Sequence, residues 1–188
     1  MHVIYLHGFC SSVQSFKAQL VKQAIEAQLE HSIFLIDLPH LPAQAISLIE
    51  AHIDTLGDAE WGVIGSSLGG YYATYLAQKY QIKAVLINPA VRAYVLLEQL
   101  LGKNKNYHSG EVFELTATHL LQLKQLYVPV ISTPQNLLLL TQTGDEVLDY
   151  REGIEYYKRA KQVIIEGGNH GFDDYADYLQ QTFTHLLG

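Results

Sequence analysis

At residues 61–70 the chain reads WGVIGSSLGG, and this stretch decides the fold. It contains the pattern G-x-S-x-G with Ser67 at its centre, a short β-type run before it, and a helix-forming run from Tyr71 to Tyr80 after it. This context is typical of a nucleophile elbow, a sharp strand-to-helix turn that exposes one serine at its tip. Gly65 and Gly69 are expected where the helix and its neighbours approach closely. Because glycine and serine are common in turns, the pattern needs support from the rest of the chain.

The regions around this stretch predict an α/β fold. Six short runs are apolar at consecutive positions, which is typical of strands in a parallel sheet covered on both faces. Helical patterns lie between them, so we expect a compact, about six-stranded and mostly parallel sheet with helices on both faces. Right-handed crossovers would place every loop after a strand at one edge of the sheet. The predicted strands are Val3–Leu6, Ile33–Ile36, Gly62–Gly65, Ala84–Ile87, Leu137–Thr141 and Gln162–Ile165, and the predicted helices are Gln14–Leu29, Ala43–Leu56, Leu68–Tyr80, Asp149–Arg159 and Tyr175–Leu187.

Residues 91–134 interrupt the alternation, because this segment is too long for a simple crossover. It predicts a helix at Val91–Leu101, a polar loop at Gly102–Gly110 and a second helix around Ala117–Tyr127. We interpret the insert as a small helical cap over the functional site, within a single domain that covers residues 1–188. The alternative is a pair of surface helices that only shields the sheet, since long insertions are not always functional.

Composition bounds the protein class. The chain has 188 residues, of which 48% are hydrophobic and 16% charged, which suits one packed domain. Its net charge of −7 argues against nucleic acid or an anionic membrane as a partner. Cys10 is the single cysteine, so neither an intramolecular disulfide nor a cysteine metal site is expected. No signal segment and no membrane span are recognisable, so a cytoplasmic location is expected.

An acid and a histidine follow Ser67 in the chain. A serine hydroxyl becomes nucleophilic when a base removes its proton, and a third group holds that base in one tautomer. Asp145 follows a buried strand in a Gly-Asp turn, and His170 ends the glycine-rich loop after the last strand. The order Ser, Asp, His is the order of α/β-hydrolases. We predict Ser67, Asp145 and His170 as the catalytic residues.

Other residues compete for two of these roles. Asp149 and Glu146 are alternatives for the acid, although Asp149 could simply cap the helix that it begins. His7 is the alternative for the base, because it ends the first strand at the same edge of the sheet. The His7-Gly8 pair better fits a loop that supplies an oxyanion donor.

Two backbone N–H groups are the expected oxyanion donors. One belongs to the residue after the nucleophile, Leu68, and the other to the loop after the first strand, where we predict Phe9. Gly8 would leave space for that backbone to approach. Cys10, in the same loop, is not on an elbow, so we interpret it as a small thiol without a catalytic role.

Five blocks of the chain resemble the YqiA-like bacterial esterase family. The resemblance runs from the first strand to the last helix, and it implies a compact α/β-hydrolase fold that hydrolyses carboxylic esters or acyl thioesters without a cofactor or metal. It also implies the triad roles of Ser67, Asp145 and His170, whereas the insert matches only in patches. The blocks are HGF at 7–9, GSSLGGYYAT at 65–74, NPAVR at 88–92, QTGDEVLDYR at 142–151 and IEGGNH at 165–170.

These observations predict a serine carboxylesterase or thioesterase that acts on a small-molecule acyl ester or thioester through an acyl-enzyme. Asn88-Pro89 is interpreted as a turn that ends a strand. Arg92 is the predicted contact for a substrate carboxylate or phosphate, although a solvated or Glu98-paired arginine is equally consistent. The alternative function is a non-catalytic binding protein on the same scaffold, which the fold alone does not exclude.

Overall fold

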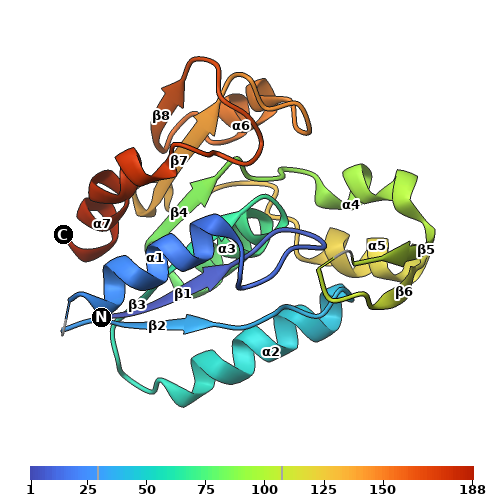
Figure 1. Cartoon of the computed structure of the whole chain (residues 1–188), viewed down its shortest axis with the longest axis horizontal. Helices are drawn as coiled ribbons and strands as arrows, with labels where there is room; N and C mark the ends of the chain where they lie inside the picture. Colours follow the sequence, from blue (N-terminus) through green and yellow to red (C-terminus); the bar gives the residue numbers. More distant parts are fainter. Residues whose placement is uncertain (29, 107) are drawn as a thin grey trace.

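A parallel six-stranded sheet forms the centre of the molecule in a computed structural model that describes residues 1–28, 30–106 and 108–188 (Figure 1). Every neighbouring pair of its strands is parallel. All six strands predicted from the sequence are confirmed, and each observed strand end lies within one residue of the predicted end. The strands are β1 (His2–Leu6), β2 (Ser32–Leu35), β3 (Trp61–Ser66), β4 (Ala84–Ile87), β7 (Leu137–Gln142) and β8 (Lys161–Ile165), in the order β2-β1-β3-β4-β7-β8.

The two faces of the sheet carry separate cores. One face packs against α2 (Pro42–Thr55) and α3 (Leu68–Tyr80), and the other against α1 (Phe16–Glu26) and α7 (Leu179–Leu187). Successive strand residues point to opposite faces, so β1 gives Ile4 to the first core and Val3 to the second. Both sides of the four inner strands are therefore buried and apolar, which explains their continuous hydrophobic runs in the sequence.

Helix α1 is shorter than predicted at both ends, since it begins at Phe16 and not at Gln14. It ends at Glu26, and Leu29, the last residue of the predicted helix, lies outside the described residues. The helix buries Ala18, Val21 and Ile25, while Phe16 is 56% exposed. The remaining predicted helices are confirmed, the last of them as a 3-10 turn at Tyr175–Tyr178 followed by α7, and the one after β7 as α6 (Tyr150–Tyr156).

The insert between β4 and β7 contains a β-hairpin that the sequence analysis did not predict, and the first strand of this hairpin falls in the predicted polar loop. Strand β5 (Gly102–Lys105) pairs antiparallel with β6 (Val112–Leu115), and Tyr107, within the predicted loop, lies outside the described residues. The prediction was wrong because an exposed hairpin needs only one half-buried face, so its outer positions can all be polar. The two predicted helices of the insert are confirmed as α4 (Ala93–Leu96) with the 3-10 turn η1 (Leu97–Leu100) and as α5 (Ala117–Gln125), whereas the 3-10 turn η2 (Pro134–Asn136) was not predicted.

The insert lies at one end of the sheet, the end toward which β1 and β2 point (Figure 1). It touches the rest of the molecule through aromatic contacts, since Phe113 of β6 packs edge-on against Phe9 and stacks on His40. The ring centroids of Phe113 and Phe9 lie 5.7 Å apart. The hairpin therefore rests on the loop that follows β1.

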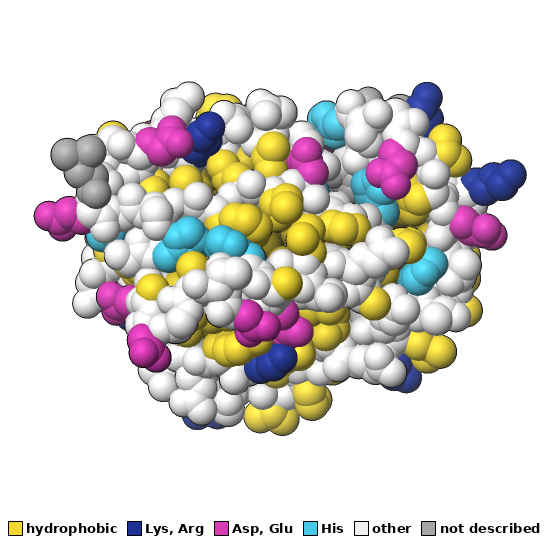
Figure 2. All heavy atoms as spheres, turned by 90° about the horizontal axis from the view of Figure 1, so that it is seen from below, with side chains coloured by type: hydrophobic (Ala, Val, Ile, Leu, Met, Phe, Trp, Pro, Cys, Tyr) yellow, Lys and Arg dark blue, Asp and Glu magenta, His cyan; other side chains and the backbone are white. Residues whose placement is uncertain are grey.

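The surface on the side of α2 is mixed in character. Figure 2 shows hydrophobic side chains across the middle of this face, histidines on either side of them, and lysine and arginine side chains that are scattered rather than gathered. No helix in the described part of the chain is long and apolar enough to cross a membrane.

Candidate active site

The turn between β3 and α3 holds Ser67 in a strained conformation. The backbone of Ser67 has φ 55° and ψ −118°, a conformation that residues with a side chain rarely adopt. Its N–H donates to the Ile87 carbonyl at 3.0 Å, which anchors the turn to β4. A Cβ on Gly65 would lie 2.2 Å from the Gly69 carbonyl oxygen, and one on Gly69 would lie 2.0 Å from the Leu6 carbonyl oxygen. The two glycines of G-x-S-x-G are thus required by close backbone approach.

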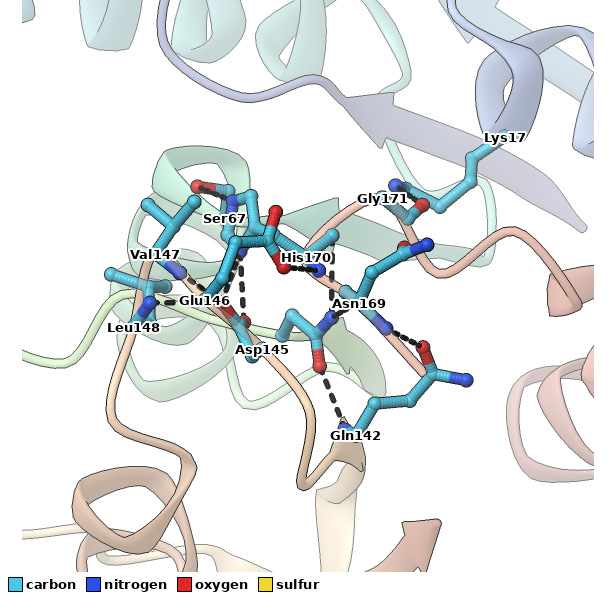
Figure 3. Close-up of polar contacts among 11 residues, drawn as sticks. Lys17, Ser67, Gln142, Asp145, Glu146, Val147, Leu148, Asn169, His170 and Gly171 are labelled. Atoms are coloured by element: carbon cyan, nitrogen blue, oxygen red, sulfur yellow. Dashed lines mark hydrogen bonds and ion pairs between the residues drawn. The ribbon is translucent and has the colours of Figure 1, made fainter. Parts of the chain in front are cut away.

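Ser67, His170 and Asp145 form a continuous row of hydrogen bonds (Figure 3). The Ser67 Oγ lies 3.1 Å from His170 Nε2, and His170 Nδ1 lies 2.8 Å from Asp145 Oδ2. Because the carboxylate can only accept, His170 Nδ1 carries the proton and Nε2 presents a lone pair to the serine hydroxyl. The three side chains come from the ends of β3, β7 and β8, as the topology requires.

The carboxylate of Asp145 is enclosed and held in place. Its side chain is 1% exposed, against 21% for His170. The Asp145 Oδ1 accepts the backbone N–H groups of Val147 at 2.9 Å and Leu148 at 2.8 Å. These bonds fix the carboxylate beside the imidazole.

The alternative acids have other contacts. Asp149 accepts the Arg151 backbone N–H at 3.0 Å and so caps α6, and it also pairs with the Arg151 side chain, which lowers the Asp149 pKa. Glu146 accepts the backbone N–H of His170 at 3.0 Å. It therefore holds the histidine loop without touching the imidazole.

The alternative base, His7, is a buried structural residue. The Leu38 N–H donates to His7 Nε2 at 2.9 Å, so that nitrogen is unprotonated, and His7 Nδ1 donates to the Gly8 carbonyl at 2.8 Å. Burial lowers the pKa of His7, which favours the same neutral form. His7 thus ties the β1 loop to the β2 loop.

Two residues that the sequence analysis did not assign to the site hold the histidine loop from below. The Asn88 Nδ2 donates to the Asn169 carbonyl at 3.0 Å and the His170 carbonyl at 3.3 Å, and its Oδ1 accepts the Gln142 N–H at 3.0 Å. The Gln142 side chain accepts the Asn169 N–H at 3.0 Å. Both residues are buried polar groups, and Asn88 has φ 39°. For both residues, the sequence signal that could have identified them was a polar side chain at the end of an apolar strand.

The predicted oxyanion donors lie beside Ser67. A Cβ on Gly8 would be 3.2 Å from the Ser67 Cβ, so the backbone of the β1 loop passes against the serine. Leu68 is the first residue of α3, where a backbone N–H has no acceptor within its own helix. Phe9 and Leu68 both line a cleft with Ser67. Their donor roles remain predictions.

Two hollows meet at Ser67 and His170 and differ in character. The first, named here the apolar cleft, has a volume of about 270 Å³ and is walled by α4 and η1 on one side and by Val147 and Leu148 on the other. The second, the polar pocket, has a volume of about 150 Å³ and lies toward the start of α1. The polar pocket is lined by Tyr5, His7, Gly8, Phe9, Ser11, Ser15, Lys17, Ser66, Ser67, His170 and Gly171.

Arg92 lies apart from both hollows. Its side chain is 55% exposed and pairs with Glu152, not with Glu98. The contact of Arg92 with a substrate stays a prediction, and the observed position of the Arg92 side chain does not support it. Burial raises the pKa of the Cys10 thiol, in keeping with a residue that has no nucleophilic role. In the described residues, no three His, Cys, Asp or Glu side chains are arranged to hold a metal ion.

The sheet order and the crossovers define an α/β-hydrolase fold, and structures of proteins from that superfamily share it. Alpha/beta hydrolase domain-containing protein 10 from mouse is 16% identical, with a TM-score of 0.77 and coverage of 99% of this chain and 89% of that one. Est1E from Butyrivibrio proteoclasticus, in a structure with bound ferulic acid, is 14% identical, with a TM-score of 0.76 and coverage of 99% of this chain and 87% of that one. The esterase domain of a Rhodothermus marinus protein is 18% identical, with a TM-score of 0.70 and coverage of 100% of this chain and 88% of that one.

The chain itself belongs to the family described as Uncharacterised protein family (UPF0227), whose model matches residues 2–186. This match covers nearly the whole chain and confirms the resemblance drawn from the five sequence blocks.

Proposed function

We propose that this protein is a serine hydrolase that cleaves carboxylic esters or acyl thioesters. The observation that carries the proposal is the row of hydrogen bonds from Ser67 Oγ through His170 to the buried Asp145. A partly buried serine on a strained turn, a base in the required tautomer and a fixed carboxylate are together the arrangement that activates a hydroxyl. The neighbours of the same fold that are esterases support this reaction class.

In the proposed reaction, Ser67 attacks the carbonyl carbon while His170 Nε2 accepts its proton. Asp145 stabilises the imidazolium that forms, and the N–H groups of Phe9 and Leu68 hold the oxyanion. Losing one such donor typically lowers kcat by about 10²–10³. His170 then protonates the leaving alkoxide or thiolate, and a water that His170 deprotonates releases the acyl group from Ser67.

The apolar cleft suggests an acyl group of small or medium length. Its volume of about 270 Å³ is lined largely by aliphatic side chains, including Leu96, Leu97 and Leu148. Burial of a methylene group contributes about 0.8 kcal/mol, so each added carbon should favour binding until the cleft is filled.

The test is hydrolysis of p-nitrophenyl esters from two to sixteen carbons, beside the matching acyl-CoA thioesters. Three proteins are compared: wild type, Ser67→Ala and Ser47→Ala, the last with a change at an exposed serine on α2. We expect turnover that Ser47→Ala retains and Ser67→Ala loses. The acyl length with the highest kcat/KM reports the length of chain that the cleft accommodates. The comparison of oxygen esters with thioesters identifies the preferred leaving group.

A fluorophosphonate probe separates the enzyme from a binding protein on the same scaffold. Covalent labelling of folded wild type, absent in Ser67→Ala, supports the hydrolase. Folded protein that shows neither labelling nor turnover contradicts the proposal.

A further inference from the structure

The polar pocket is on the opposite side of His170 from the apolar cleft. Lys17 reaches from α1 to Gly171, away from Val147 and Leu148 (Figure 3). Its ammonium donates to the Gly171 carbonyl, which leaves further N–H donors for another acceptor. A substrate carbonyl at Ser67 therefore has an aliphatic surface on one side and a cationic one on the other.

The charge of Lys17 is only partly balanced. Burial lowers its pKa, whereas the carboxylates of Asp173 and Asp145 oppose that change. Both carboxylates are engaged elsewhere: Asp145 with His170, and Asp173 with the Asn169 side chain at 2.8 Å. Lys17 and Ser15 stand at the start of α1, where the helix dipole adds positive potential. An anion in the pocket would relieve the cost of burying the ammonium.

An independent observation is the hydroxyl of Tyr5. Its oxygen is fully buried and lies within reach of the side chains of Ser15 and Ser66. All three residues line the polar pocket. Because the Tyr5 oxygen has no exposed surface, it contacts no ligand directly, and it supports a wall of hydroxyl groups that can solvate a polar group in the pocket.

We propose that the polar pocket binds a compact anionic group on the alcohol part of the substrate, held by Lys17 beside the hydroxyl wall that Tyr5 supports. This inference rests on the proposed function and names its substrate class: an ester with an aliphatic acyl chain and an anionic alcohol. The pocket volume of about 150 Å³ equals that of about five water molecules, which suits a carboxylate or phosphate on a short alcohol. In the reaction, the bond between the carbonyl carbon and the alcohol oxygen breaks, His170 protonates that oxygen, and Lys17 transfers no proton.

The test compares two esters of nearly equal shape, O-butyrylglycolate and the neutral O-butyrylglycolamide, by butyrate release. Wild type should prefer the glycolate, and Lys17→Gln should lower that preference in kcat/KM by about tenfold or more, since the hydrogen bond lost is charge-assisted. Tyr5→Phe should lower it by a smaller factor and leave thermal unfolding unchanged or raised. The control Lys22→Gln removes the same charge from the exposed side of α1, near Glu26, and should leave the preference unchanged.

The readout is a ratio because Lys17 also contacts the loop that carries His170. A loss of kcat that is equal for both esters would mean that Lys17 only supports Gly171, and the proposal would be wrong. Absence of a preference for the glycolate in wild type that still cleaves p-nitrophenyl esters would overturn it as well. If wild type cleaves no ester and Ser67 is not labelled, the proposed function itself fails. A third substrate, 2-butyryloxyethyl phosphate, shows whether phosphate or carboxylate is the better anion.

Discussion

Helix α3, directly behind Ser67, buries nine of its thirteen residues, whereas α4, across the apolar cleft, buries Ala93 out of four. The elbow and the insert, which both border the apolar cleft, are therefore built differently. On the α3 side, backbone approaches backbone so closely that two glycines are required. On the insert side, Val95, Leu100 and Leu101 are exposed and η1 is a short 3-10 turn.

The difference separates two tasks of the site. The dense packing around α3 fixes the positions of Ser67 and of the loops around it, because a dense core has few alternative arrangements. In the insert, Leu96, Gln99 and Leu100 line the cleft and are at least partly exposed, so their loss should disturb the sheet less. We therefore expect changes near the elbow to affect folding or turnover, and changes in the insert to affect substrate choice.

The largest effect is expected for Gly69→Ala. The new methyl group would meet the Leu6 carbonyl at 2.0 Å, a backbone atom that cannot move aside. We expect a loss of about 3 kcal/mol or more in the free energy of unfolding, measured by urea denaturation, or no folded protein. The control is Gly153→Ala in α6, where no atom lies within 4 Å of the added Cβ. There, alanine should stabilise by about 0.5–1 kcal/mol. Equal effects at both sites would contradict the importance of close approach.

The next effect tests Asp145 against its neighbour. Asp145→Asn should lower kcat by about 10⁴ with p-nitrophenyl butyrate, because the amide no longer stabilises the imidazolium or the required tautomer. Asp149→Asn, which changes the cap of α6, should lower kcat little. Thermal unfolding of both variants checks that they are folded. A larger loss in Asp149→Asn would assign the acid role to that residue instead.

A third prediction concerns the support beneath the histidine loop. Asn88→Ala leaves the Gln142 N–H and the Asn169 carbonyl without their partner. Unsatisfied buried groups cost about 1–3 kcal/mol each, so urea denaturation should show a loss of that order. Because His170 would be displaced, we also expect kcat to fall by a larger factor than the factor by which KM changes. Asn136→Ala, which removes one exposed bond to the Gln81 carbonyl, should do neither.

A fourth prediction follows from His7, under the β1 loop. Burial lowers its pKa in the folded state below the ordinary value of 6.5, so the unfolded chain binds protons more readily. Its contribution to stability is therefore complete above pH 6.5 and falls as the pH decreases below that value. Urea denaturation between pH 7.5 and 5.5 should show this loss. His7→Gln, which keeps an acceptor for the Leu38 N–H, should weaken the dependence.

The smallest effect on folding is expected in the insert. Leu100→Ala removes aliphatic surface from the apolar cleft and should change the free energy of unfolding by no more than about 0.5 kcal/mol. It should lower kcat/KM for butyryl esters by about threefold to tenfold and shift the preference toward longer acyl chains. Leu121→Ala, at an exposed position on α5, is the matched control. If the profile of acyl lengths does not change, η1 is not part of the acyl wall.

The sequence predicted the packed half of the molecule well, and physical reasons explain this. The four inner strands are buried on both faces, so their composition is constrained at nearly every position, and the elbow tolerates few residues. The β5–β6 hairpin was missed because Lys103 and Lys105 point outward from a structure with only one half-buried face. Asn88 was interpreted as a simple turn residue because its partners in β7 and the histidine loop lie more than fifty positions away. Such contacts leave no local pattern.

The position of β8 has a consequence for the timing of activity. This strand forms the edge of the sheet, pairs with β7 alone, and precedes the loop that brings His170 to a serine 103 residues earlier in the chain. During synthesis the serine, its turn and all six strands emerge before His170. Since domains form as the chain emerges at about 5–20 residues per second, Ser67 would be present in the nascent chain for several seconds before its proposed base. In the proposed reaction, docking of the last strand and its loop would then also be the step that activates the serine.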